Sequence, residues 1–170
     1  MKIIKHLTIA LMVILLLVAL TACGGNPAPT PTPAPNPVKE DLKDYINNYA
    51  VAIFGPLNEE IVNNYTAAVQ TNDGDVLVTA LKENLSSNAM LIEEMEAYTP
   101  ATAEVQELHN IFLDAVKTRE IAYADILVVL TDLDATEEEI RAAFDMLAEA
   151  DSLFAEFSTE LAAMRADLGL

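Results

Sequence analysis

The sequence predicts an all-α protein, specifically an antiparallel up-down-up-down four-helix bundle. From Val38 to the end of the chain, apolar residues recur every three or four positions, as on a helix with one buried face. Short runs of Gly, Pro, Asp and Asn divide this region into four long segments, and no stretch shows the alternating pattern of a strand. Helices joined by a few residues must lie antiparallel to their neighbours, which favours the bundle.

The first segment carries one apolar stripe that is interrupted once. Gly55-Pro56 falls inside it, and proline removes a backbone donor and clashes with the preceding turn. We therefore expect a kinked first helix, or two helices that meet near Phe54. The predicted stripe comprises Leu42, Tyr45, Tyr49, Ile53, Leu57, Ile61, Tyr65 and Ala68.

A turn at Asn72-Asp73-Gly74-Asp75 precedes the second helix. Gly74 suits a left-handed helix end, and Asp75 suits the N-cap of the next helix. Asn88 occupies a core-like position, where a buried amide could fix the register. The predicted stripe comprises Leu77, Leu81, Leu85, Leu91 or Ile92, Met95 and Tyr98.

Two further signals start the remaining helices. Thr99-Pro100 combines a capping hydroxyl with a proline in the first turn, and predicts the start of the third helix. Thr136 with Glu139 forms a capping box and predicts the start of the fourth. The third stripe is Val105, Leu108, Phe112, Ala115, Ala122, Ile126, Leu130 and Leu133, and the fourth is Ile140, Phe144, Leu147, Phe154, Phe157, Leu161, Met164 and Leu168.

The N-terminus has the pattern of an export signal. Lys2 and Lys5 precede an apolar stretch of 14 residues, Leu7 to Leu20, which is short of the roughly 20 that a transmembrane helix needs. Leu20-Thr21-Ala22-Cys23 then resembles the lipobox of bacterial lipoproteins. The resemblance implies that residues 1–22 are removed and that Cys23 carries a diacylglyceryl thioether, with a further acyl chain such as palmitate on the new amino terminus. Two or more chains would anchor the protein stably to the membrane.

Proline occupies every second position from Pro27 to Pro37. This spacing predicts a semi-rigid polyproline II spacer over residues 23–37, with a reach of roughly 40 Å, between the lipid and the helical domain of residues 38–170. Glycans on Thr30 and Thr32, or recognition of the strip by a proline-binding domain, are the alternatives.

The charge excludes some partners. The chain has 27 acidic residues against nine basic ones, for a net charge of −18, and Lys2 and Lys5 lie in the segment that is removed. Such a surface repels nucleic acids and anionic lipid head groups. The expected partners are the membrane, through the lipid on Cys23, and an envelope protein or a cationic ligand; no nucleic acid is expected.

No residue pattern indicates catalysis, a cofactor or a strong metal site. His109 is the one histidine after the signal, and we interpret it as a boundary residue with one hydrogen bond. Glu93, Glu94 and Glu96 are weak candidates for a cation site, as is the Glu137 cluster, but a solvated helix face explains the first and a helix N-terminus the second. Asn72-Asp73-Gly74-Asp75 lacks the ligand spacing of a calcium loop.

These features predict a lipid-anchored extracytoplasmic envelope protein with a non-catalytic binding or structural module, located on the outer face of the cell membrane or in an outer membrane. The alternative is a carrier or sensor of a small ligand or cation. The stretch YTPATAEVQELHNIFLDA resembles uncharacterised small helical lipoproteins of bacteria, a resemblance that implies no activity.

Overall fold

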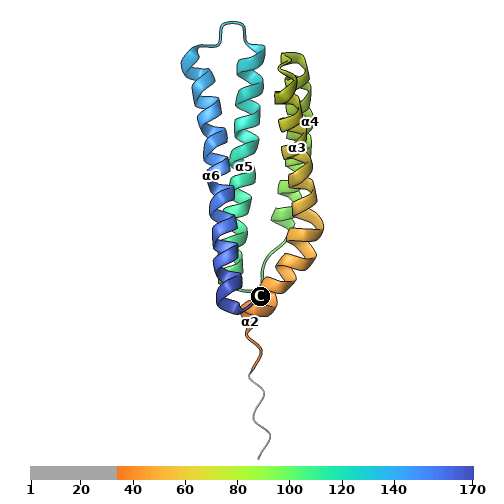
Figure 1. The fold of residues 1–170 in the computed structure, drawn as a ribbon, viewed down its shortest axis with the longest axis vertical. Helices are drawn as coiled ribbons and strands as arrows, with labels where there is room; N and C mark the ends of the chain where they lie inside the picture. The colour runs from red at the N-terminus through yellow and green to blue at the C-terminus, as the bar shows by residue number, and fades with distance from the viewer. Residues whose placement is uncertain (1–33) are drawn as a thin grey trace, which may run out of the picture. The chain divides into compact units, whose positions relative to one another are not determined.

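The computed structural model describes residues 34–170, which are helical apart from short connections and contain no strand (Figure 1). The prediction of an all-α protein is confirmed. Four helical segments follow one another along the chain, and the first of them changes its helix type twice without ending.

The first segment runs without a break from α2 (Pro37–Asp44) through a π-helix, η1 (Tyr45–Phe54), into α3 (Gly55–Thr71). The N–H of Gly55 bonds to the carbonyl of Ala50, five residues back, and Pro56 follows with no N–H to place. The wider turn of η1 thus accommodates the proline, and the segment does not divide into two helices. Figure 1 shows its path changing direction between α2 and α3.

The π-helix also moves the buried face by one residue. Tyr45 and Phe54 are the buried residues of η1, whereas Ile53, which we expected in the stripe, is only half-buried. A period longer than 3.6 residues explains the shift, because it brings Tyr49 and Phe54, five positions apart, to the same face. Their rings lie 6.1 Å apart.

The turn into α4 (Gly74–Ala97) is built two residues earlier than expected. Asn72, not Gly74, adopts the left-handed conformation, with φ 53°, a conformation that asparagine tolerates better than most residues. Asp73, not Asp75, is the N-cap, and its carboxylate accepts hydrogen bonds from the N–H groups of Asp75 and Val76. Gly74 is simply the first residue of the helix.

Helix α5 (Ala103–Thr131) starts three residues after Pro100, so the predicted start at Thr99-Pro100 is wrong. Its N-cap, Thr102, makes no capping bond of its own. The buried carboxylate of Asp41 in α2 accepts hydrogen bonds from the N–H groups of Ala101 (3.1 Å) and Thr102 (2.8 Å) and from the Thr102 hydroxyl (2.6 Å). A residue far away in the sequence therefore caps this helix.

Helix α6 (Glu137–Leu168) begins at the predicted capping box of Thr136 and Glu139, which is confirmed. Its buried residues are the small Ala143 and Ala150, which allow close approach to α5. Large apolar residues flank these alanines and are half-buried or exposed. The expected core positions Leu130, Leu133, Ile140 and Phe144 are exposed, in contradiction to the stripes predicted for the third and fourth helices.

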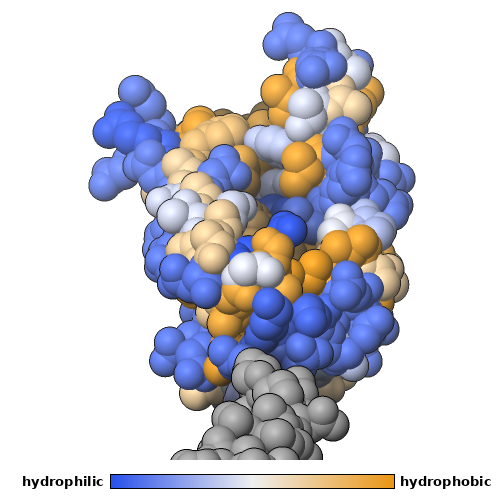
Figure 2. Space-filling model, turned by 60° about the horizontal axis from the view of Figure 1, so that its bottom comes forward, coloured by the Kyte–Doolittle hydropathy of each residue, from blue (hydrophilic) through white to orange (hydrophobic). Residues whose placement is uncertain are grey.

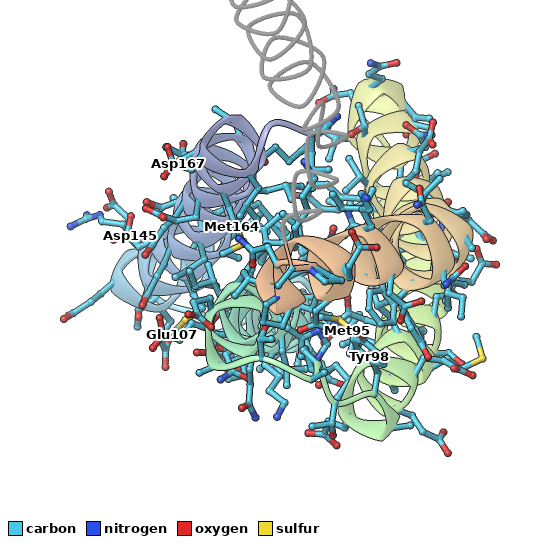
Figure 3. All side chains as sticks on the ribbon, turned by 90° about the horizontal axis from the view of Figure 1, so that it is seen from below. Met95, Tyr98, Glu107, Asp145, Met164 and Asp167 are labelled. Atoms are coloured by element: carbon cyan, nitrogen blue, oxygen red, sulfur yellow. The ribbon has the colours of Figure 1, made fainter. Side chains whose placement is uncertain are left out.

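Successive segments pack on one another: α3 on α4, α4 on α5, and α5 on α6. Helix α2 crosses one end of the domain and contacts α5, and its Lys39 ammonium donates to the carbonyls of Leu168 (2.6 Å) and Gly169 (3.3 Å). Seen from that end, Met95 and Met164 point towards α2, whereas Asp145 and Asp167 point outwards (Figure 3). The core lies among α4, α5 and the first segment, and α6 covers one side.

Candidate functional site

A groove separates the first helical segment from α6. It consists of two cavities of about 480 and 210 Å³, and both are lined by Val62 of α3 and by Asp151 and Phe154 of α6. Figure 2 shows this face hollowed between two columns of residues, with apolar surface along the hollow and hydrophilic surface at its bottom. We call this feature the α3–α6 groove.

The larger cavity is mainly apolar. Helix η1 contributes one wall, α6 the other, and Phe112 of α5 lies between them. Phe112 stacks on Phe157, with ring centroids 4.7 Å apart, and meets Phe154 edge-on at 5.8 Å. The apolar lining residues are Ile46, Ala50, Val51, Val62, Phe112, Phe154, Phe157 and Leu161.

Arg119 of α5 lines the smaller cavity although its side chain is only 2 % exposed. Asn88 Oδ1 accepts hydrogen bonds from Nε (3.1 Å) and Nη2 (2.7 Å), and Asn58 Oδ1 accepts one from Nη1 (2.6 Å). The guanidinium carbon lies 4.9 Å from the centre of the Phe154 ring. Two amides and one aromatic face therefore hold the cation at the bottom of the groove.

Arg119 has no carboxylate within ion-pair distance among residues 34–170. Burial lowers the pKa of Arg119 to about 10, and Tyr123 and Asp151 partly offset that effect. The guanidinium is therefore charged at neutral pH. Burying a cation without a counter-ion costs free energy. The position of Arg119 at a cavity therefore makes it a candidate for binding a ligand.

The charges of the groove differ from those of the rest of the domain. Arg165 of α6 lines the larger cavity and, like Arg119, makes no ion pair within the described part of the chain. Asp151 is the single acidic residue in the lining. Two other cavities, one between α3 and α4 and one between α5 and α6, are lined by acids and contain no base. The groove is thus a locally positive site in a strongly acidic protein.

A layer of buried amides fixes this site to the rest of the fold. Asn88 Nδ2 donates to the carbonyl of Val116 (2.9 Å), which orients Oδ1 towards Arg119. Asn84, also buried, donates to the carbonyl of Ile61 (2.9 Å) and accepts from Asn64 (2.9 Å). The prediction that Asn88 is a buried amide is confirmed, and the structure adds its role as the acceptor for Arg119.

A second cluster gathers aromatic rings near α2. His109 is 3 % exposed, so the interpretation as a boundary residue is wrong, although its single hydrogen bond, between Nε2 and the carbonyl of Met95 (3.0 Å), agrees with the expectation. Burial lowers the pKa of His109, and the Met95 carbonyl opposes this effect. The Tyr45 ring meets the imidazole edge-on at 5.7 Å. The Tyr45 hydroxyl and His109 Nδ1 are both buried without a hydrogen-bond partner.

The other predicted site residues are not brought together in this way. Cys23 lies outside the described residues. Glu93, Glu94 and Glu96 are exposed, and Glu96 pairs with Lys117 at 2.6 Å. Between residues 34 and 170, no group of three or more acidic, histidine or cysteine side chains is placed to hold a metal ion. Within the same range, no helix is long and apolar enough to cross a membrane.

Sequence reasoning missed Arg119 and its partner Asn58. One signal could have found Arg119: it follows Phe112, Ala115 and Val116 at helical spacing, so it occupies a core position of α5. A charged residue on a predicted buried face is a candidate for a functional role.

The fold and the site define an all-helical domain with a partly apolar groove that ends on a buried arginine. The chain matches no protein-family model, no curated protein and no solved structure.

Proposed function

We propose that this protein is a lipid-anchored extracytoplasmic bacterial envelope protein whose helical domain is a non-catalytic binding module. In this proposal the four helical segments form an up-down-up-down bundle that is open between α3 and α6, where the ligand binds. The single observation that carries the binding function is the α3–α6 groove with the buried Arg119 at its bottom.

The size and lining of the groove suit a small molecule. Ligand cavities are typically ~300–1,000 Å³, largely apolar, with a few polar groups that fix orientation. The larger cavity alone reaches about 480 Å³, and Arg119 supplies the polar group next to it. The groove therefore favours a carrier or sensor of a small ligand over a purely structural role.

The lining supports binding without catalysis. Ser158 is the serine of the groove, and its hydroxyl donates to the carbonyl of Phe154 at 2.9 Å, in its own helix. A serine nucleophile needs an adjacent base. His109, the histidine of the described residues, belongs to the aromatic cluster and not to the groove lining.

A matched pair of tryptophan variants on α6 tests the binding site. Ser158→Trp places an indole in the groove, whereas Ser152→Trp places one at an exposed position outside the lining. A fragment library is screened by methyl NMR on the purified protein. We expect hits that shift the methyl signals of Val62 and Leu161 and that are lost in Ser158→Trp but kept in Ser152→Trp. Hits confined to other surfaces would refute the groove as the site.

The anchor and the bundle have their own tests. Cys23→Ser should abolish metabolic labelling with a fatty acid, because a hydroxyl cannot replace the thiol in thioether formation; undiminished labelling would refute the anchor.

The bundle places the two turns at Asn72 and Asp134 at one end. Spin labels at these positions should be closer to each other than a label at Asn72 is to one at Ala101, and the reverse order would refute the arrangement.

A second candidate function is the docking of an envelope protein. Large apolar side chains are exposed around the turn between α5 and α6, among them Leu133, which is fully exposed. Exposed apolar patches mark interaction sites. Cross-linking in cells from a photoreactive residue at position 133 should capture a partner, and a matched residue at position 93 should not. The exposed large apolar residues near this turn are Val128, Leu130, Leu133, Ile140 and Phe144.

A further inference from the structure

We propose that the α3–α6 groove binds an anionic amphiphile: a molecule with one carboxylate, which Arg119 holds, and an apolar body, which lies between η1 and α6. This inference rests on the proposed function and names the chemical class of the ligand.

Two of the five N–H groups of the Arg119 guanidinium make no hydrogen bond to residues 34–170. An arginine has five N–H donors, and three of them bond to Asn58 and Asn88. The remaining two are one on Nη1 and one on Nη2. A carboxylate can accept charge-assisted hydrogen bonds from such donors, and these bonds are stronger than those between neutral groups. The two asparagines fix the position of the guanidinium, so little side-chain entropy is lost on binding.

The charge balance of the lining matches a single negative charge. Arg119 and Arg165 contribute two cations, and Asp151 contributes one anion. One carboxylate therefore neutralises the lining. The strongly acidic exterior repels anions, whereas the lining of the groove carries a net positive charge.

The larger cavity limits the length of the apolar part of the ligand. Phe154 lies next to the guanidinium, and Leu161 and Arg165 follow it on the same helix. At 1.5 Å per residue, Leu161 is about 10 Å and Arg165 about 16 Å further along α6. Aromatic and aliphatic side chains line this path, so it can cover an apolar chain of medium length.

Straight-chain carboxylates of six to ten carbons, with the matching alcohols and amines, test the inference. Calorimetric titration uses the purified full-length protein in nanodiscs, with empty discs subtracted. We expect each acid to bind at least tenfold more tightly than its alcohol and the amines not to bind. Acid affinity should rise up to about fourfold per added methylene. Equal affinity of acids and alcohols for the wild-type protein would overturn the inference.

Three variants locate the carboxylate. Arg119→Gln should remove the preference for acids over alcohols. Arg141→Gln is the matched control, because Arg141 is exposed and pairs with Glu137 away from the groove, and it should change nothing. Asp151→Asn removes the single negative charge of the lining and should tighten acid binding several-fold. Asp151 is exposed, so this variant keeps the inference testable if Arg119→Gln does not fold.

The outcomes separate this inference from the proposed function. Tight binding of the amines would mean that Asp151 is the ligand-binding group, and weaker acid binding in Asp151→Asn would contradict the charge balance of the lining. Either result would overturn the inference. If library fragments bind in the groove but the acids show no preference, the ligand class is wrong and the binding site stands. If nothing binds in the groove, the proposed function fails as well.

Discussion

The bond network between Asp41 and the start of α5 should be a major contributor to stability, and Asp41→Ala tests it. The carboxylate accepts hydrogen bonds from two backbone N–H groups and one hydroxyl, all at a helix N-terminus. Helix N-termini favour a negative charge, and hydrogen bonds to charged groups contribute about 1.5–3 kcal/mol each. The Thr102 hydroxyl can bond to water after the change, so we count the two N–H groups.

Allowing for incomplete additivity, we expect Asp41→Ala to lower the free energy of unfolding by about 2–4 kcal/mol. Urea denaturation measures this value directly, and a thermal melt should show a fall in Tm of roughly 10 °C. Asp41→Asn keeps one acceptor oxygen and should lose about half as much. The measured order should be wild type, then Asn, then Ala.

Glu40→Ala is the matched control on the same helix. Glu40 pairs with Lys43 at 2.9 Å, but both side chains are exposed, and such pairs contribute about 0–1 kcal/mol. If Asp41→Ala and Glu40→Ala have equal effects, Asp41 does not cap α5 in solution, and the start of this helix has another cause.

Three further predictions concern single residues. Gly55→Ala places a Cβ 2.7 Å from the Ala50 carbonyl oxygen and should lower the free energy of unfolding, measured by urea denaturation, by about 1–3 kcal/mol. Gly74→Ala meets nothing within 4 Å and should be neutral or stabilising by about 0.4–1 kcal/mol. Equal effects of the two variants would contradict the packing of η1. Thr136→Ala removes the capping box of α6 and should lower the free energy of unfolding by about 0.5–2 kcal/mol. Thr159→Ala loses only a hydrogen bond within an exposed helical turn and should have a smaller effect. The opposite order would count against the cap. Burial lowers the pKa of His109 from 6.5, so the unfolded state takes up the proton before the folded state as the pH falls. The wild-type protein should therefore lose stability relative to His109→Gln below about pH 6.5. Parallel profiles of unfolding free energy against pH for the two proteins would show that the imidazole is solvated.

The sequence predicts well those features that depend on neighbouring residues. The capping box of Thr136 and Glu139, the buried Asn88 and the core positions Leu108 and Ala122 all follow from local spacing. The start of α5 does not, because the group that caps it is Asp41 of α2, about 60 residues away. No local pattern reports a hydrogen bond of that range.

The apolar pattern of the sequence predicts neither the π-helix nor the groove. A stripe drawn with a period of 3.6 assigns Ile53 to the core, whereas the period of η1 selects Phe54. The groove lies between α3 and α6, which are not consecutive in the chain, and no local pattern reports how far apart two such helices lie. Phe154 and Phe157 look like core residues in the sequence but line a cavity in the fold.

We expect Arg119 to contribute to ligand binding but little to net stability, and a double-mutant cycle with Asn88 tests this expectation. Asn88→Leu alone leaves Nε and Nη2 of a buried cation without their acceptor and should cost about 3–5 kcal/mol. Arg119→Met alone leaves only a neutral amide oxygen unpaired, at about 1–3 kcal/mol. The double variant leaves neither, because Asn58 faces the groove and can bond to water, and the Val116 carbonyl lies inside α5.

The double variant should therefore lie within about 1 kcal/mol of wild type, or above it, because replacing a buried charged network with apolar residues is often neutral or stabilising. Urea denaturation of the four proteins gives the coupling energy. A double variant as unstable as Asn88→Leu would show that the network is needed for folding itself. The expected result, a stable domain that no longer prefers acids, would show that the buried arginine contributes little net stability and that its role is to bind the ligand.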